Sequence, residues 1–366
     1  MTNEMYWLWL ANIKNIGRKK TETLLSTLGT AEQLFKATPI AVGEVFENYK
    51  CFQKDDLTTF LASRDEEKIA KYHKKILEAG ISYVVKYDPN YPNSLKNIYD
   101  PPYLLYYRGE LIKDESIKIA IVGARKCSPY GKKVAEYFGK MLANNNITVV
   151  SGMARGIDSA AHIGALAGHG KTMAILGCGV NVCYPEENYH LMQEIIHSGC
   201  VLSESPINAA PLAGNFPLRN RIISGLCDGV IVVEAALKSG SLITADSALE
   251  QGKDVFAVPG RIFDPLSEGT NQLIKMGAKS ITCIEDVLEE YMDLSEKTIG
   301  KETVLEKTLD QSEKEVYALI SLDPIQLDTM CRSLKMNIDE LQWILMKLEL
   351  AGMIEQLPNK YFVKRV

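Results

Sequence analysis

The chain has 366 residues, which is enough for two or three domains, and its net charge is −5. With 46% hydrophobic and 24% charged residues, the composition is typical of a folded protein in water. No run reaches the roughly 18 apolar residues that a membrane helix needs, and the N-terminal MTNEMYWLWLANIK lacks the basic start of a secretory signal. These features argue against secreted, membrane-spanning, collagen-like and disordered classes, and we expect a cytoplasmic protein.

The eight cysteines are scattered, without the CxxC pairs of a zinc site or the density of a disulfide framework. We therefore expect reduced thiols, no metal and no cofactor. Charge is uneven along the chain, because residues 123–175 hold seven basic and two acidic side chains, whereas residues 284–315 hold four basic and eleven acidic ones. Net acidity thus does not exclude nucleic acid as a ligand, since phosphate binding depends on local charge.

The chain divides by pattern into blocks. Residues 1–75 are helical by their apolar periodicity. In residues 76–293, short apolar runs alternate with longer amphipathic ones, which predicts a doubly wound α/β domain with helices on both faces of a mostly parallel sheet. The predicted strands are 81–85, 117–122, 147–150, 172–176, 201–203, 229–233, 255–258 and 280–283.

The C-terminal part begins with an acidic stretch, residues 294–311, which we interpret as a linker or a solvated helix. Residues 312–366 read as three helices followed by two β-like segments, Met353–Gln356 and Tyr361–Lys364. Three helices and a hairpin are the pattern of a winged helix.

Ligands of an open α/β sheet bind beyond the carboxyl ends of its strands, so the segments after the strands are the candidate sites. After the strand at 117–122 come Gly123, which allows a tight turn, Arg125, whose guanidinium suits phosphate, and Ser128, which can cap the next helix. A helix start offers free amides to an anion. The alternative is a tight turn with a solvated arginine.

The next strand end repeats this arrangement with Ser151 and Gly152. Two neighbouring corners of this kind favour a phosphate-bearing ligand that spans both. Lys171 precedes the third strand, so strand direction places it at the opposite end of the sheet. We keep Lys171 as a candidate, because an inserted loop could bring it to the carboxyl ends of the strands.

A long loop ends in Phe216, which is followed by Arg219, Asn220 and Arg221. Two guanidinium groups and an amide can hold phosphates, while the ring offers a face for base stacking. The alternative is that Phe216 belongs to the core and that one of the arginines pairs with a nearby glutamate.

Another helix start follows the strand at 229–233 and forms a further candidate phosphate cradle. Its residues are Ser239, Gly240, Ser241 and Thr244. Glu234 ends the same strand and is the best single candidate for a catalytic carboxylate, but no second acid–base group accompanies it. An enzyme is therefore the weaker interpretation of these residues.

Over roughly residues 119–277 the chain resembles the DNA-processing protein A (DprA, also called Smf) family. The resemblance is carried by VGARKCSPYG, SGMARGIDSAAH, GCGVNVCYPEEN, NFPLRNRIISGL and VVEAALKSGSLITADSALEQGKDVFAVPG, in the family's order. It implies an extended Rossmann-like sheet that binds single-stranded DNA without reading its sequence. It also implies a homodimer that loads the RecA recombinase in natural transformation, with a single-strand-binding protein as a further partner and no membrane.

The same resemblance assigns DNA contacts to Arg125, Arg219 and Arg221, and to Lys171, which matches the family's basic residue before the third strand. The segment IKNIGRKKTETLLSTLG is similar to a helix-hairpin-helix (SAM-like) element, although Asn15 replaces the usual first glycine. The cations that suit phosphate there are Lys14, Arg18, Lys19 and Lys20. A purely structural hairpin is the alternative.

The expected function is therefore a non-catalytic binder that protects incoming single-stranded DNA and delivers it to RecA. One alternative is a nucleotide-processing enzyme of the LOG-like phosphoribohydrolase type, whose PGGxGTxxE signature is missing here. Another is a duplex-DNA regulator acting through the winged helix. Acidic residues on the third helix of that domain instead favour a protein-contact or regulatory role, because duplex phosphates would repel them.

Overall fold

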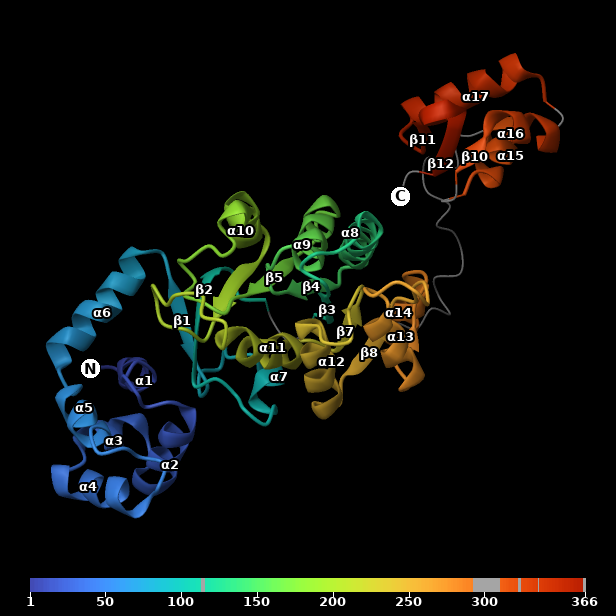
Figure 1. Cartoon of the computed structure of the whole chain (residues 1–366). Coiled ribbons are helices and arrows are strands. Elements are labelled where there is room, and N and C mark those ends of the chain that lie inside the picture. Colours follow the sequence, from blue (N-terminus) through green and yellow to red (C-terminus); the bar gives the residue numbers. More distant parts are fainter. Residues whose placement is uncertain (113–115, 292–309, 322–323, 335, 365–366) are drawn as a thin grey trace. The chain divides into compact units, whose positions relative to one another are not determined.

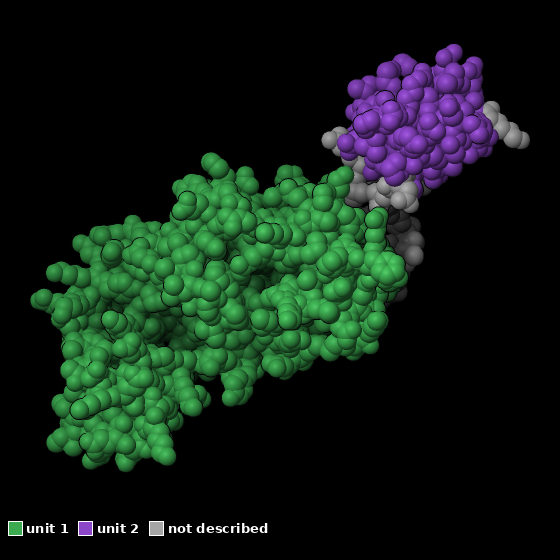
Figure 2. All heavy atoms as spheres, in the orientation of Figure 1, with its two compact units in different colours: residues 1–291 green, residues 292–366 purple. Residues whose placement is uncertain are grey.

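The computed structural model describes residues 1–112, 116–291, 310–321, 324–334 and 336–364. The chain forms two compact units, residues 1–291 and residues 292–366, coloured separately in Figure 2. The predicted linker, residues 294–311, lies outside the described residues except for its last two. In the part of the chain that is described, no helix is both long and apolar enough to cross a membrane.

A nine-stranded sheet forms the centre of the first unit (Figure 1), in the order β1-β2-β6-β5-β4-β3-β7-β8-β9. β2 pairs antiparallel with β1 and β6, and all other neighbours are parallel. The doubly wound, mostly parallel sheet is thereby confirmed. The strands are β1 Ser82–Val85, β2 Leu104–Gly109, β3 Lys118–Val122, β4 Thr148–Ser151, β5 Thr172–Ile175, β6 Cys200–Ser203, β7 Gly229–Val232, β8 Asp254–Ala257 and β9 Lys279–Ser280.

Strand β2 is not among the predicted strands. Its segment follows Pro101 and Pro102, and it becomes a strand through pairing with β1 and β6, which lie far from it on either side in sequence. The last predicted strand, 280–283, is shifted, because β9 ends at Ser280.

Helices cover both faces of the parallel strands (Figure 1). One face carries α8 (Pro129–Asn144), α9 (Ile157–Ala167) and α10 (Tyr189–Ser198), and the other carries α11 (Asn215–Leu226), α12 (Gly240–Glu250) and α13 (Glu268–Lys275). Parallel crossovers are right-handed, so helices that connect strands added in opposite directions along the sheet lie on opposite faces. The direction reverses when the chain returns from β6 to β7, which lies beside β3. The short helices α7 (Asn93–Lys96) and α14 (Glu285–Tyr291) complete this part.

Glycines allow α8 and α9 to pack closely. A Cβ at Gly164 would run into the carbonyl oxygen of Glu136, and a Cβ at Gly139 into that of Ala161. Since these helices follow neighbouring strands, their packing sets the separation of the loops in front of them.

Six helices precede the sheet: α1 (Asn3–Ala11), α2 (Arg18–Leu28), α3 (Ala31–Lys36), α4 (Pro39–Asn48), α5 (Asp56–Ala62) and α6 (Glu66–Glu78). Their apolar side chains form one core with side chains of the first two strands, such as Val85 and Leu104. The predicted boundary between a helical domain, 1–75, and a sheet domain, 76–293, stays a prediction about folding units, because this core crosses it.

The second unit has its own core and the order of a winged helix. It contains α15 (Gln311–Leu319), β10 (Ile325–Gln326), α16 (Leu327–Leu334), α17 (Ile338–Leu350), β11 (Ile354–Leu357) and β12 (Tyr361–Lys364). β10, which is not predicted, pairs with β12. The outer face of α17 exposes Trp343, Met346 and Leu350 beside Asp339 and Glu340, so it is apolar and acidic.

Gly164→Ala should lower the free energy of unfolding by about 1–3 kcal/mol, because the added methyl group forces α8 and α9 apart. Urea denaturation measures the loss. Gly43→Ala in α4 is the matched control, since the nearest atom to its Cβ would be Leu57 Cδ2 at 3.9 Å. The control should be neutral or slightly stabilising. Equal stability of the two variants would contradict the close packing.

Candidate functional site

The reversal of strand order beside β3 defines the candidate site. β3 lies between β4 and β7, so the chain runs along the sheet in one direction to β6 and later in the other. In sheets of this kind, ligands bind outside the carboxyl ends of the strands at this point. We call the edge formed by the loops after β3, β4, β5, β7 and β8 the rim.

Glu234, the second residue after β7, holds both ends of the loop that follows β3. Its carbonyl oxygen accepts the Ala124 N–H at 2.8 Å. Its carboxylate accepts the Ser128 N–H at 2.9 Å and the Ser128 hydroxyl at 2.5 Å. Gly123 is required here, since a Cβ would lie 2.9 Å from the Glu234 carbonyl oxygen. One residue that follows β7 therefore fixes the loop between positions 123 and 128.

The start of α8 is a predicted phosphate site, but the chain's own carboxylate fills it. Ser128 caps the helix as predicted, because its Oγ accepts the Gly131 N–H at 2.9 Å. The same hydroxyl and the Ser128 amide are both engaged by Glu234, which is only 5% exposed. We therefore leave Ser128 out of the interface, and Glu234 is a structural group rather than an open carboxylate.

Arg125 lies over the Phe216 ring on the rim, and the plane of the Tyr184 ring is tilted by 41° to that of Phe216. We call these three side chains the Arg125 stack. The guanidinium carbon of Arg125 lies 5.0 Å from the centroid of the Phe216 ring, and the rings of Phe216 and Tyr184 are 5.7 Å apart. Arg125 is exposed, whereas Phe216 is half-buried and packs over Gly177. Tyr184, which is not among the predicted site residues, is exposed. A cation and two rings in a row can hold a phosphate and offer faces to bases.

Arg219 lies beneath the rim rather than on it. Its guanidinium donates to the Ile175 carbonyl oxygen and packs against Gly152, where a Cβ would collide with it. Arg219 is 6% exposed, and burial lowers its pKa. The buried Asp158 supplies a charge that favours the guanidinium, while burial raises the pKa of that carboxyl. Arg219 thus positions the loops after β4 and β5, and this placement does not support a direct DNA contact.

A buried histidine lies behind the same loops. His162 is fully buried in α9, and its Nδ1 is 2.7 Å from the Thr172 hydroxyl. Burial, aided by Arg219, lowers the pKa of His162 to about 3. The ring is therefore neutral at physiological pH and belongs to the core.

Arg221 belongs to an ion cluster with Glu204, Asp100 and Arg18. Its Nη2 is 2.5 Å from Glu204 Oε2 and its Nε is 3.3 Å from Asp100 Oδ2, and Arg18 also pairs with Asp100. Burial raises the pKa of Glu204 and lowers that of Arg18. The alternative interpretation, that an arginine of this loop pairs with a glutamate, is confirmed for Arg221. The cluster joins α2 to α11, and it commits the Arg221 guanidinium, whose side chain is 13% exposed, to two carboxylates.

The N-terminal hairpin uses another of its predicted cations internally. Lys20 Nζ donates to Asp56 at 2.6 Å and to the Asn15 carbonyl oxygen at 2.9 Å. Asn15 has a φ of 65°, a left-handed conformation that asparagine tolerates in place of glycine. Lys14 and Lys19 are exposed. With Arg18 and Lys20 paired, the geometry favours the structural reading of the hairpin.

The start of α12 is only partly accessible. Ser239 caps the helix by accepting the Ser241 N–H at 3.3 Å, and the two hydroxyl oxygens are 2.7 Å apart. Gly240 is exposed, and its carbonyl oxygen accepts the side-chain amide of Asn220 at 3.1 Å. Asn220, Ser241 and Thr244 are buried. Ser239 and Gly240 are thus the accessible members of this cradle.

Lys171 and Ser151 are not brought to the exposed part of the rim. Lys171 lies at the amino end of β5, and a four-residue strand separates this end from the rim by about 13 Å. Ser151, the last residue of β4, is fully buried and donates to the Ile121 carbonyl oxygen at 2.6 Å. We leave both side chains out of the interface.

The loops after β4 and β5 are tied together across the rim. Arg155 Nε and Nη2 donate to the Glu187 carboxylate at 2.7 and 2.8 Å. The Asn188 amide donates to the Met153 carbonyl oxygen at 2.9 Å and to Ser159 Oγ at 2.8 Å. Both partners of the ion pair are more than half exposed, so the pair contributes little stability and a phosphate can replace Glu187.

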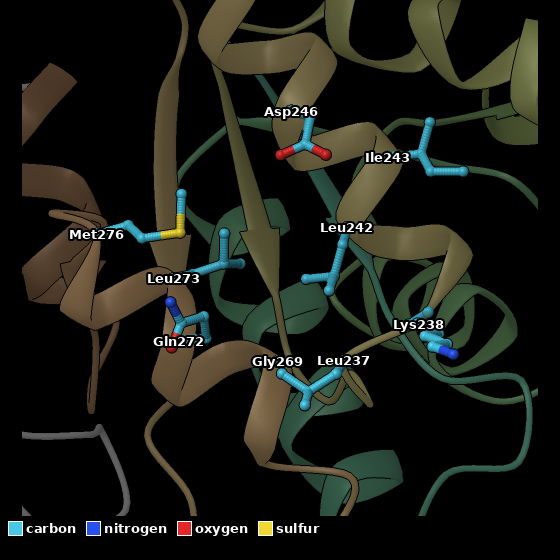
Figure 3. A pocket seen from close by; sticks show the side chains of 10 residues that line it. Leu237, Lys238, Leu242, Ile243, Asp246, Gly269, Gln272, Leu273 and Met276 are labelled. Atoms are coloured by element: carbon cyan, nitrogen blue, oxygen red, sulfur yellow. The ribbon is translucent and has the colours of Figure 1, made fainter.

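A groove of about 360 Å³ lies between α12 and α13 (Figure 3). Its lining is mixed, with Leu242 and Leu273 among the apolar residues and Asp246 among the charged ones. Leu237 and Met276 are more than half exposed at the same place. Exposed apolar side chains of this kind fit a protein surface better than a phosphate.

The eight cysteines are all free thiols, as expected. Burial raises the pKa of Cys178 to about 11, which makes it unreactive. In the described ranges, no three His, Cys, Asp or Glu side chains are arranged to hold a metal ion.

Comparison with known proteins gives consistent matches. The family model "DNA recombination-mediator protein A" matches residues 82–292, and the model "DprA winged helix domain" matches residues 301–360. The chain is 50% identical to the DNA processing protein DprA of Streptococcus pneumoniae over 204 residues, which are 56% of this chain and 72% of that protein. The crystal structure of the pneumococcal DprA aligns with a TM-score of 0.67 and 39% identity, covering 80% of this chain and 99% of that one. A DprA structure from Helicobacter pylori, described by its single-stranded DNA binding mode, aligns with a TM-score of 0.53 and 34% identity, covering 58% and 97%.

Glu234→Ala should lower the free energy of unfolding by about 1–3 kcal/mol, because it leaves the Ser128 N–H and hydroxyl without their acceptor. Glu234→Gln is the matched control, since its amide oxygen can still accept the Ser128 N–H, and its loss should be smaller. Urea denaturation measures both variants. Hydrogen exchange at the Ser128 amide should accelerate in the alanine variant. Unchanged exchange there would contradict the hydrogen bond from the Ser128 N–H to Glu234.

Proposed function

The chain belongs to the DNA recombination-mediator protein A family, and from this premise we propose that it binds single-stranded DNA along the rim and delivers it to a RecA-type recombinase. The observation that carries the proposal is the stack of Arg125, Phe216 and Tyr184 at the reversal point of the sheet, in which Arg125 and Tyr184 are exposed. The similar Helicobacter pylori protein is described as binding single-stranded DNA, which supports the same ligand here.

The chemistry of the rim suits a DNA strand better than a free nucleotide. The pocket at the start of α8, where a mononucleotide phosphate would sit, is filled by Glu234. The accessible groups lie outside it, as a row of cations and rings. Arg125 and Lys126 are exposed on one loop, Ser239 and Gly240 lie at the α12 start, and Arg155 needs only to exchange Glu187 for a phosphate. Such a row binds through phosphates and base stacking, with strong salt dependence and little sequence preference.

We place this function in the cytosol, as a homodimer that works with RecA and with a single-strand-binding protein in natural transformation. The proposed dimer contact is the surface of α12 and α13, where Leu249 of α12 is exposed and the exposed Met276 lines the groove of Figure 3. Sedimentation velocity tests the dimer, and a monomer at micromolar concentration would overturn it. Delivery is tested by RecA ATP hydrolysis on protein-coated single strands, and a rate that this protein leaves unchanged would overturn it.

The enzyme alternative, a LOG-like phosphoribohydrolase, has weaker support. Its best candidate carboxylate, Glu234, is buried and engaged with Ser128. Incubation with AMP-type substrates tests it, because release of free base would favour the enzyme.

The duplex-DNA regulator also has weaker support, since the outer face of α17 is apolar and acidic. Removing residues 312–366 separates the two functions. Single-strand binding should survive the deletion under our proposal, and it would be lost if the winged helix carried the DNA.

Arg125→Ala should weaken binding to oligo-dT by about 1–3 kcal/mol, the scale of a lost charged hydrogen bond. Fluorescence anisotropy at two salt concentrations measures the affinity and its salt slope. Lys171→Ala removes the same charge from the opposite edge of the sheet and should leave the affinity within about twofold. Unchanged binding in the Arg125 variant would contradict DNA binding at the rim. An equal loss in both variants would mean that the DNA also contacts the opposite edge of the sheet, at the amino ends of the strands, where Lys171 lies.

A further inference from the structure

The loop after β8 ends in a rigid turn at Arg261–Asp264. The Asp264 N–H donates to the Arg261 carbonyl oxygen at 3.1 Å, and the Asp264 carboxylate accepts the Leu266 N–H at 2.9 Å. At the entry of the turn, the Asn271 side chain bonds both the N–H and the carbonyl oxygen of Gly260, at 3.2 and 3.1 Å. The backbone of this turn is thus held from both sides.

The two residues at the tip of the turn are apolar and almost fully exposed. Ile262 is 78% exposed and Phe263 is 92% exposed, and Arg261 beside them is exposed as well. A phenylalanine in this position contributes nothing to the core. A preordered turn that presents a ring and a guanidinium has little entropy to lose when it binds a partner.

Hydrogen bonds connect this turn to the Arg125 loop through one segment. Glu234 holds the loop after β3 with its carbonyl oxygen and its carboxylate. The next residue, Ala235, donates its N–H to the Leu266 carbonyl oxygen at 2.7 Å and accepts the Gly269 N–H at 2.7 Å. The corners after β3, β7 and β8 are therefore one continuous stretch of the rim.

The separation along the rim suits a single DNA strand. β8 is two strands away from β3, which corresponds to about 10 Å at the sheet, and four strands away from β5, which corresponds to about 19 Å. Lys238, exposed in the loop after β7, lies between the Arg125 loop and the Arg261 turn in this order. Positive groups thus continue along the edge, and the one acidic side chain of the turn, Asp264, is bonded to its own backbone.

We propose that Phe263 and Arg261 form a second contact for the same DNA strand, with a base stacked on the ring and a phosphate on the guanidinium. This inference rests on the proposed function and extends it, because it predicts that the strand runs from the Arg125 stack over the loop after β7 to β8. A strand too short to reach β8 does not use the turn. Affinity for DNA therefore grows with length until the turn is reached.

The test compares oligo-dT of about 2 and about 20 nucleotides, because the distance of about 10 Å between β3 and β8 corresponds to about three stacked nucleotides at 3.4 Å each. Phe263→Ala should bind the longer strand about five- to a hundredfold more weakly, the range that loss of one base stack implies, and should bind the shorter strand as the wild type does. Arg261→Ala should reduce the salt slope on the longer strand by about 0.7, the value for one phosphate of a single strand. Phe263→Trp keeps a ring and should retain the affinity.

Tyr49→Ala, which removes another exposed ring at the C-cap of α4, is the matched control and should change neither affinity. If Phe263→Ala binds both lengths like the wild type while Arg125→Ala is weakened, the second contact is wrong and the proposed function stands. If the wild type binds neither length, the proposed function itself fails. If Phe263→Ala instead changes the sedimentation coefficient and leaves DNA binding intact, the turn is a protein contact and the inference is overturned.

Discussion

The hydrogen bonds of Glu234 are the interaction on which the rest of the rim depends. Its carboxylate and carbonyl oxygen hold the loop after β3, and the adjoining Ala235 holds the loop after β8. A negative group at the start of α8 also complements the positive end of that helix, beside the cap that Ser128 makes with the Gly131 N–H. The position that binds a nucleotide phosphate in many sheets of this type is thus occupied here by the chain's own carboxylate. For this reason our proposal places the DNA on the outer edge.

Burial divides the arginines of this region into two classes. Arg219 is buried and pairs with the backbone of β5, and Arg221 is committed to two carboxylates, so both shape the rim. Arg125 is exposed and lies over an aromatic ring, and Arg155 forms an ion pair with the exposed Glu187. Exposed guanidinium groups can exchange partners at low cost, whereas moving a buried one leaves unpaired groups behind. For this reason the proposed phosphate contacts are the exposed arginines, Arg125 and Arg155.

The flanking regions show how the same charges can serve structure. Arg18 and Lys20 occupy positions that suit phosphate in a hairpin, yet they pair with Asp100 and Asp56. In the winged helix, α17 presents apolar and acidic side chains where a duplex reader needs cations. On the rim of the sheet, by contrast, Arg125 and Lys126 are exposed.

Local pattern was enough to predict the alternation of strands and helices, the winged helix, the capping of α8 by Ser128 and the exposed Arg125, because these depend on neighbours within a few residues. The sequence could not show that Ser128 faces Glu234, 106 positions away, or that Arg219 donates to Ile175, 44 positions away. Pairing across the sheet also decides that β2 is a strand and that Lys171 lies at the far edge. Whether a charged side chain binds a ligand or its own chain depends on burial and on partners distant in sequence, and only the tertiary structure supplies these.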